Sequence, residues 1–211
     1  MDRELNITVI LDRSGSMGHC VESTISGFNQ FVNNQKKENP DATLSLVQFD
    51  DVIETVYSDV PIKDVELLTT KTFVPRGLTA LYDAIGKTLV SKVQYIRRMK
   101  RLKSSPKMLI IIITDGYENS SYKYSSKQIM DMIERKKKHK SESWEFLFLG
   151  ANQDAILSAS KVGISASKAL NYSVSDEGIA ATYRAISDLS TQYSKGGNIE
   201  FSDEQRNNAL K

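Results

Sequence analysis

Short apolar runs alternate along the chain with longer stretches in which apolar positions recur every three or four residues. The short runs are rich in Val, Ile and Leu and end at polar or glycine-containing segments, which is typical of buried strands. They predict six strands, the last from a weaker pattern: Ile7–Leu11, Thr43–Phe49, Val52–Tyr57, Met108–Thr114, Trp144–Leu149 and Ala169–Tyr172. The longer stretches predict helices at Cys20–Gln35, Ala80–Ile96, 129–140, Asp154–Val162 and Asp176–Tyr193.

This alternation of strand and helix favours a doubly wound α/β sheet. The run Met108–Thr114 is almost continuously apolar, as expected for a central parallel strand covered on both faces. Only Asp50 and Asp51 separate the second and third strands, which leaves room for an antiparallel hairpin but not for a crossover helix. The predicted fold is therefore Rossmann-like, with a doubly wound, mostly parallel six-stranded sheet, one antiparallel edge strand and helices on both faces.

The first strand ends abruptly at Asp12, and Ser14 and Ser16 follow at once. In open α/β sheets, ligands bind just beyond the carboxyl ends of the strands. Alternate spacing in an extended loop would point one carboxylate and two hydroxyl groups in the same direction, because side chains have a period of two. Hard oxygen donors select Mg²⁺, Ca²⁺ or Mn²⁺ over zinc, so this loop is a candidate cation site.

Three ligands are too few for an octahedral ion, and two other segments offer more oxygen atoms. The strand Met108–Thr114 also ends at an aspartate, Asp115, which Gly116 follows. Thr79 stands in the loop that enters the helix starting at Ala80. Because parallel strands end at one edge of the sheet, we expect these side chains to converge with those of the first loop.

These three motifs resemble the metal-ion-dependent adhesion site of von Willebrand factor type A domains. They are D-x-S-x-S at residues 12–16, Thr79 within GLTALYDAI and the aspartate of IIITDG, in the right order. The resemblance covers nearly the whole chain, from about residue 5 to about residue 195. It implies that the metal is contacted by Ser14, Ser16 and Thr79 and bound, directly or through water, by Asp12 and Asp115. It also implies a sixth position filled by water or by an acidic side chain of a partner.

We therefore expect a metal-dependent protein-interaction module rather than an enzyme. Mg²⁺ is the expected ion, with Mn²⁺ or Ca²⁺ as alternatives, and the expected partner is another protein that presents Asp or Glu to the metal. Two other functions stay open. One is a metal-assisted hydrolase that uses a metal-bound water, for which the chain offers only His19 and His139 as histidine bases. The other is a scaffold domain with a non-functional metal loop.

The composition of the chain mainly excludes certain structures and partners. The chain has 211 residues and 40% hydrophobic content, which suits a single domain with a large core. We expect this domain to span residues 1–195 and to be followed by a polar C-terminal tail, 196–211. The net charge of +2 gives no general case for nucleic acid or an anionic membrane as partner. A single cysteine, Cys20, excludes an internal disulfide and a cysteine-based metal cluster.

Targeting signals also bear on the expected location. The opening MDRELN leads straight into a strand without a signal segment, and no apolar run approaches the roughly 20 residues needed to span a bilayer. A cytoplasmic protein of the intracellular bacterial or phage-type branch is therefore expected.

Plainer explanations compete for several of these residues. Asp12, Ser14 and Ser16 could form a turn that caps the following helix, and Thr79 could be an N-cap. Glu118 and Asn119 could support the metal site or simply lie on the surface of their loop. In the same loop, Tyr117, Tyr122 and Tyr124 suit either a partner interface or packing on the loop itself.

Catalytic arrangements of the same residues are disfavoured. His19 and Cys20 are adjacent in sequence, whereas the members of a nucleophile pair normally come from separate segments. A Ser14, His19 and Asp115 triad lacks the G-x-S-x-G nucleophile elbow. A haloacid-dehalogenase-type phosphatase would need an aspartate at position 14, and no glycine-rich motif for binding phosphate is present.

Two basic runs, Arg97–Lys103 and Arg135–Lys140, fall at the predicted C-termini of helices. Cations at this end complement the helix dipole, so solvated helix ends are the plain interpretation. Contact with nucleic acid or with an acidic partner is the alternative.

Overall fold

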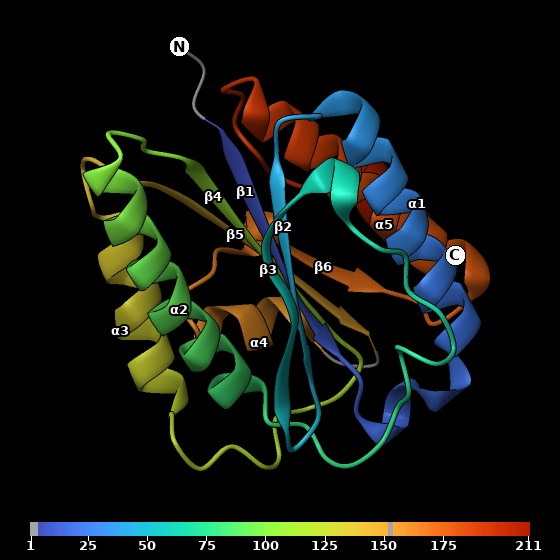
Figure 1. Ribbon diagram of the computed structural model, residues 1–211. Coiled ribbons are helices and arrows are strands. Elements are labelled where there is room, and N and C mark those ends of the chain that lie inside the picture. The colour runs from blue at the N-terminus through green and yellow to red at the C-terminus, as the bar shows by residue number, and fades with distance from the viewer. Residues whose placement is uncertain (1–3, 152–153) are drawn as a thin grey trace.

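A six-stranded sheet forms the centre of the molecule in a computed structural model that describes residues 4–151 and 154–211 (Figure 1). The strand order is β3-β2-β1-β4-β5-β6. β3 runs antiparallel to β2, and the other neighbouring strands are parallel. The strands are β1 (Leu5–Asp12), β2 (Thr43–Phe49), β3 (Ile53–Pro61), β4 (Lys107–Thr114), β5 (Ser143–Ala151) and β6 (Ala169–Tyr172).

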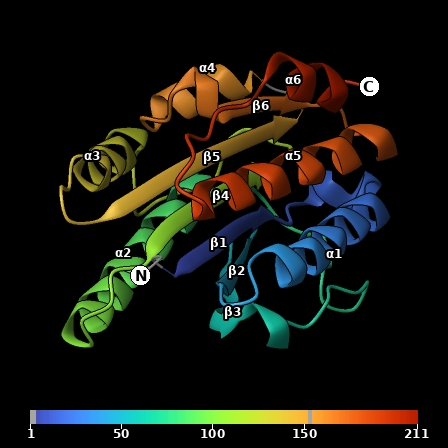
Figure 2. The ribbon, with the colours of Figure 1, turned by 90° about the horizontal axis from the view of Figure 1, so that it is seen from above.

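Helices cover both faces of this sheet. Figures 1 and 2 show α1 and α5 on one side and α2 and α3 on the other. The helices are α1 (Val21–Glu38), α2 (Leu81–Arg101), α3 (Ser126–Lys137), α4 (Ala155–Lys161), α5 (Asp176–Ser194) and α6 (Asp203–Ala209). The predicted Rossmann-like class, with its single antiparallel edge strand, is confirmed.

The core has two halves because side chains alternate across each strand. In β1, Ile7, Val9 and Leu11 pack with α1 and α5, whereas Ile10 packs with α2 and α3. β4 continues both sets, since all its residues from Met108 to Thr114 are buried. Burial on both faces explains why this strand reads as an unbroken apolar run.

The C-terminal segment is more ordered than its composition predicts. Its polar residues predict a tail from 196 to 211, but the structure forms α6 there, with Ile199, Phe201 and Ala209 buried. The backbone N–H of Ser173 donates to the carbonyl of Ala209 at 2.8 Å. The few apolar residues of this segment have no helical or strand period, so the pattern could not reveal its packing.

Among the described residues, every helix is too short or too polar to cross a bilayer.

We predict that Gly27→Ala destabilises the fold. Gly27 lies in α1, where α1 packs on α5, and a Cβ atom there would clash with the buried ring of Tyr183. Overpacking of this kind costs about 1–3 kcal/mol, which should exceed the roughly 1 kcal/mol gained from replacing a helical glycine. Urea unfolding measures the change. Gly18→Ala is the control, because its Cβ would meet no atom within 4 Å. An equal effect in both variants would contradict the packing argument.

Candidate metal centre

Asp12 stands at the end of β1 with its carboxylate fully buried. Its Oδ1 accepts the backbone N–H of Ser14 at 2.7 Å, and its Oδ2 accepts the hydroxyl of Thr114, on the neighbouring β4, at 2.6 Å. Burial raises the pKa of Asp12 to about 6 despite these hydrogen bonds, and the charge of Asp115 adds to the rise. The carboxylate is therefore held in one orientation at an energetic cost.

The two serines extend from this anchor toward Asp115. Ser14 Oγ lies 3.0 Å from Ser16 Oγ, and the Ser16 hydroxyl donates to Asp115 Oδ1 at 2.6 Å. Ser14 is buried and Ser16 is exposed, so the row of oxygens leads from the interior to the surface. Neither the short helix Gly15–His19 nor α1 has a side-chain cap bond at its start. Ser14 occupies the N-cap position of the short helix, but its hydroxyl makes no capping bond.

Thr79 reaches the same place from the loop before α2. A Cβ atom built on Gly116 would lie 3.4 Å from Thr79 Oγ1 and 3.5 Å from Ser16 Oγ, so these hydroxyls flank one point. The N-cap residue of α2 is Ala80, so Thr79 is not that helix's cap. The backbone of Thr79 is fixed on both sides by Asn119, which accepts its N–H at 2.8 Å and donates to its carbonyl at 3.0 Å.

These donors fit a hard divalent cation. Asp115 Oδ2 is buried, and no described residue gives it a hydrogen bond. Such an atom is costly unless something positive meets it. Burial raises the pKa of Asp115, and the Ser16 hydroxyl and the charge of His19 partly oppose that rise. No group of three His, Cys, Asp or Glu side chains in the described residues could hold a metal. A metal here would thus depend on hydroxyl oxygens, which favour Mg²⁺ or Mn²⁺.

An ion cluster that the sequence did not reveal supports the loops. Buried Arg13 donates from Nε to Asp50 Oδ2 at 2.9 Å and from Nη1 to Glu54 at 2.7 Å. Arg76 donates to the same Asp50 oxygen at 3.0 Å. Alternation along the chain turns the side chain of Arg13 away from those of its neighbours Asp12 and Ser14. This alternation is the feature of the sequence that could have indicated a separate role for Arg13.

The loop that carries Thr79 is tied to this cluster through its backbone. The N–H of Ala80 donates to the carbonyl of Asp50, and the N–H of Arg76 to that of Arg13. Gly77 has φ +66°, and any side chain there would collide with the Asp51 carboxylate. The β2–β3 hairpin therefore sets the position of Thr79.

The loop after β4 is docked on the start of α2. Asp83 accepts the backbone N–H groups of residues 122, 123 and 124, and Glu118 accepts the N–H of Tyr82 at 2.9 Å. Glu118 and Asn119 therefore support the neighbouring loops through hydrogen bonds, while Asn119 also lies at the surface. Tyr117 and Tyr122 remain 63% and 79% exposed, while the ring of Tyr124 packs over Gly86.

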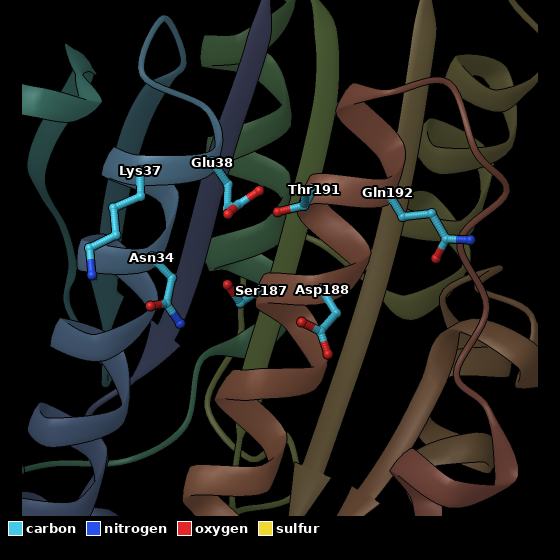
Figure 3. Close-up of a pocket in the computed structure, with 7 residues that line it drawn as sticks. All are labelled: Asn34, Lys37, Glu38, Ser187, Asp188, Thr191 and Gln192. Carbon is cyan, nitrogen blue, oxygen red and sulfur yellow. The ribbon is translucent and has the colours of Figure 1, made fainter.

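Other candidate centres are weaker. The Cys20 thiol is buried and donates to the Met17 carbonyl, and burial raises its pKa, which is the opposite of an activated nucleophile. Figure 3 shows a polar groove between α1 and α5 that includes Glu38, the last residue of α1. α1 begins beside the candidate metal loop, and the groove starts at Asn34, 13 residues further on, so it lies about 20 Å or more away along the helix.

Comparison with known proteins matches this chain to one protein family and to solved structures of one fold. The family model described as von Willebrand factor type A domain matches residues 6–182. Comparison with curated protein sequences gives no significant match. A von Willebrand factor type A structure from Catenulispora acidiphila is 16% identical with a TM-score of 0.56, and it covers 90% of this chain and 43% of its own.

Two further structures are similar at the level of the fold. The ArnB paralog VWA2 from Sulfolobus acidocaldarius is 20% identical with a TM-score of 0.54, over 89% of this chain and 45% of its own. Proximal thread matrix protein 1 from the mussel byssus, solved with a zinc-occupied MIDAS motif, is 14% identical with a TM-score of 0.60, over 90% of this chain and 46% of its own. The chain spans less than half the length of each.

We predict opposite effects of Asp115→Asn on stability and on metal response. The wild type should gain about 2.7 kcal/mol at a hundredfold excess of Mg²⁺ or Mn²⁺ over its Kd. Asn removes the buried charge, so the metal-free variant should be as stable as the wild type or more stable by up to about 1 kcal/mol, and it should lose the metal shift. Thermal melting with metal and with chelator measures both. Ser141→Ala, at an exposed serine outside the centre, should keep the full shift. A shift in Asp115→Asn equal to that of the wild type would contradict the assignment.

The metal-induced shift should also depend on pH. The folded-state pKa of Asp12, about 6, lies above its ordinary 3.8. The metal-free native state therefore binds more protons than the unfolded state between these values, and its stability falls as pH rises through this window. A cation needs the ionised carboxylate, so the increase in Tm caused by Mg²⁺ should be full at pH 7.5 and largely lost by pH 5. An increase independent of pH would exclude Asp12 from the centre.

Proposed function

The chain belongs to the von Willebrand factor type A domain family, and on that basis we propose that it is a metal-dependent protein-interaction module. Ser14, Ser16 and Thr79 would hold a divalent cation, supported by Asp12 and Asp115. The observation that carries the proposal is the buried, unpartnered Oδ2 of Asp115 beside these hydroxyls. Mg²⁺ is the proposed ion. The zinc-occupied motif of the mussel byssus protein supports a divalent cation at the equivalent place in this fold.

The cation would supply an attachment point for one more anionic oxygen. Three neutral hydroxyls and two carboxylates, some acting through water, leave its charge incompletely neutralised, so a partner's Asp or Glu can complete an octahedral shell. The chain's own contribution is rigidity. Asn119, Asp50 and Gly77 hold the Thr79 loop before any ligand arrives, which lowers the cost of binding.

Exposed apolar side chains near the centre suit a protein partner. Leu78 and Tyr117 adjoin Thr79 and Gly116 in sequence and are 56% and 63% exposed. Tyr122 and Val52 line a groove next to them, between the β2–β3 hairpin and the start of α2. Tyrosine is enriched in the cores of protein interfaces, so this rim would surround the carboxylate contact with apolar area.

A metal-assisted hydrolase is the second candidate, because His19 lies close enough for its charge to lower the pKa of Asp115. Turnover of generic phosphate or ester substrates by the wild type, lost in Ser14→Ala, would favour it. The cytoplasmic location and the bacterial or phage origin stay predictions.

The module is tested by a matched pair at Thr79. Partner capture by the wild type should require Mg²⁺ and be abolished by chelator. Thr79→Val keeps the shape but removes the oxygen, and it should weaken capture at least about tenfold. Thr79→Ser keeps the hydroxyl and should retain most of the binding. Affinity pull-down followed by titration of the recovered partner measures the effect. Capture that persists equally in chelator, or in Thr79→Val, would contradict the proposal.

A further inference from the structure

The fold brings the two basic runs of the sequence together on one face. Residues 97–103 form the end of α2 and the turn after it, residues 135–140 form the end of α3 and the turn after it, and these helices pack side by side. Glu142 joins the two runs, since it accepts Lys100 Nζ at 2.7 Å and Lys136 Nζ at 3.4 Å. The Ser105 hydroxyl, just after the first run, donates to the Ser141 carbonyl, just after the second, at 3.3 Å. We call residues 97–103 and 135–140 the basic face.

The basic face and the metal centre lie at opposite ends of the molecule. The strands β1 and β4 point toward the centre, and the last turns of α2 and α3 lie at the other end of the sheet (Figure 1). α2 starts beside Thr79 and has 21 residues, so its last turn is about 30 Å from the centre. A ligand on the basic face would therefore leave the centre open.

Most of the charge on this face is uncompensated. The two runs hold ten Lys and Arg residues, whereas the whole chain carries only +2, so positive charge is concentrated here. Within the described residues, no carboxylate lies within ion-pair distance of six of them, and these six are exposed: Arg97, Arg101, Lys103, Arg135, Lys137 and Lys140. The two helix C-termini supply only about half a negative charge each, which is too little to explain ten cations.

The make-up of the face selects the kind of partner. Protein interfaces are poor in lysine and rich in aromatic residues in their cores, and the two runs contain no aromatic residue. Membrane insertion needs a continuous apolar surface, and Leu102, 69% exposed, is the one large apolar side chain strongly exposed in these runs. A phosphate polymer needs only clustered cations, each of which releases a counterion on binding.

We propose that the basic face binds the phosphate backbone of nucleic acid without reading its sequence. The contacts through Glu142 hold the two helix ends in a fixed relation, so the cations are arranged before the ligand binds. The small net charge of the chain gives no general case for nucleic acid as a partner. A bound phosphate backbone, however, interacts mainly with the local positive charge of the basic face and not with the net charge of the chain.

The test is fluorescence anisotropy with a labelled 20-base-pair DNA duplex of arbitrary sequence and with single-stranded RNA of equal length. The wild type should bind, and its affinity should fall on the order of a hundredfold between 50 and 200 mM KCl if about four phosphates are neutralised. Arg101→Gln/Lys103→Gln/Lys140→Gln should weaken binding at least about tenfold at 50 mM KCl and reduce the salt slope by about 2 to 3. Circular dichroism checks that this variant is folded.

The matched control is Lys37→Gln/Lys63→Gln/Lys71→Gln, which changes the net charge equally at three exposed lysines outside the face. It should bind almost as the wild type does. Equal weakening in both triple variants would overturn the proposal, since net charge alone would then explain binding. Preference for phosphatidylserine vesicles over both nucleic acids would also overturn it. Binding of nucleic acid should be unchanged by chelator and in Ser14→Ala. The result of this test therefore does not depend on whether the proposed metal centre is correct.

Discussion

The parallel pairing of β1 with β4 is the constraint on which the proposed metal centre depends. Leu11 is in register with Ile113, which sets Asp12 beside Thr114 and brings Asp115 next to the loop after β1. Because successive side chains point to opposite faces, a slip of one residue would turn Asp12 away and separate the two carboxylates. The apolar residues that fix this register are buried on both faces of the sheet. The hydrophobic core therefore also positions the oxygen donors.

Holding these carboxylates costs stability in the absence of a cation. Asp12 and Asp115 are both buried, burial raises the pKa of each, and Asp115 Oδ2 has no partner among the described residues. A few residues away, the fold handles buried charge differently, since Arg13 and Asp50 neutralise each other directly. One buried cluster thus has its charges paired within the chain, although Arg13 Nη2 lacks a hydrogen-bond partner among the described residues, and it holds the loops. In the other, Asp115 Oδ2 has no such partner, and the proposed cation would supply it at a site where function is favoured over stability.

The molecule also separates its charges in space. Acidic and hydroxyl oxygens gather at the carboxyl ends of the strands, and the basic face lies at the opposite end. α2 connects the two, with Thr79 just before its start and Arg101 at its end. With this helix between them, the two ends would bind the chemically different ligands proposed above without direct interference.

The sequence by itself determined the fold class and the candidate oxygen donors. Apolar runs with a period of two and helical repeats are local patterns, and D-x-S-x-S is contiguous, so each can be recognised without knowing what it contacts. Only the tertiary structure decided that Arg13 pairs with Asp50, that Asp83 fixes the loop after β4, that residues 199–209 pack on the domain, and that the two basic runs form one face. Each of these depends on contacts between segments far apart in the chain. Their energies come from burial and from opposite charges brought together, which no local pattern records.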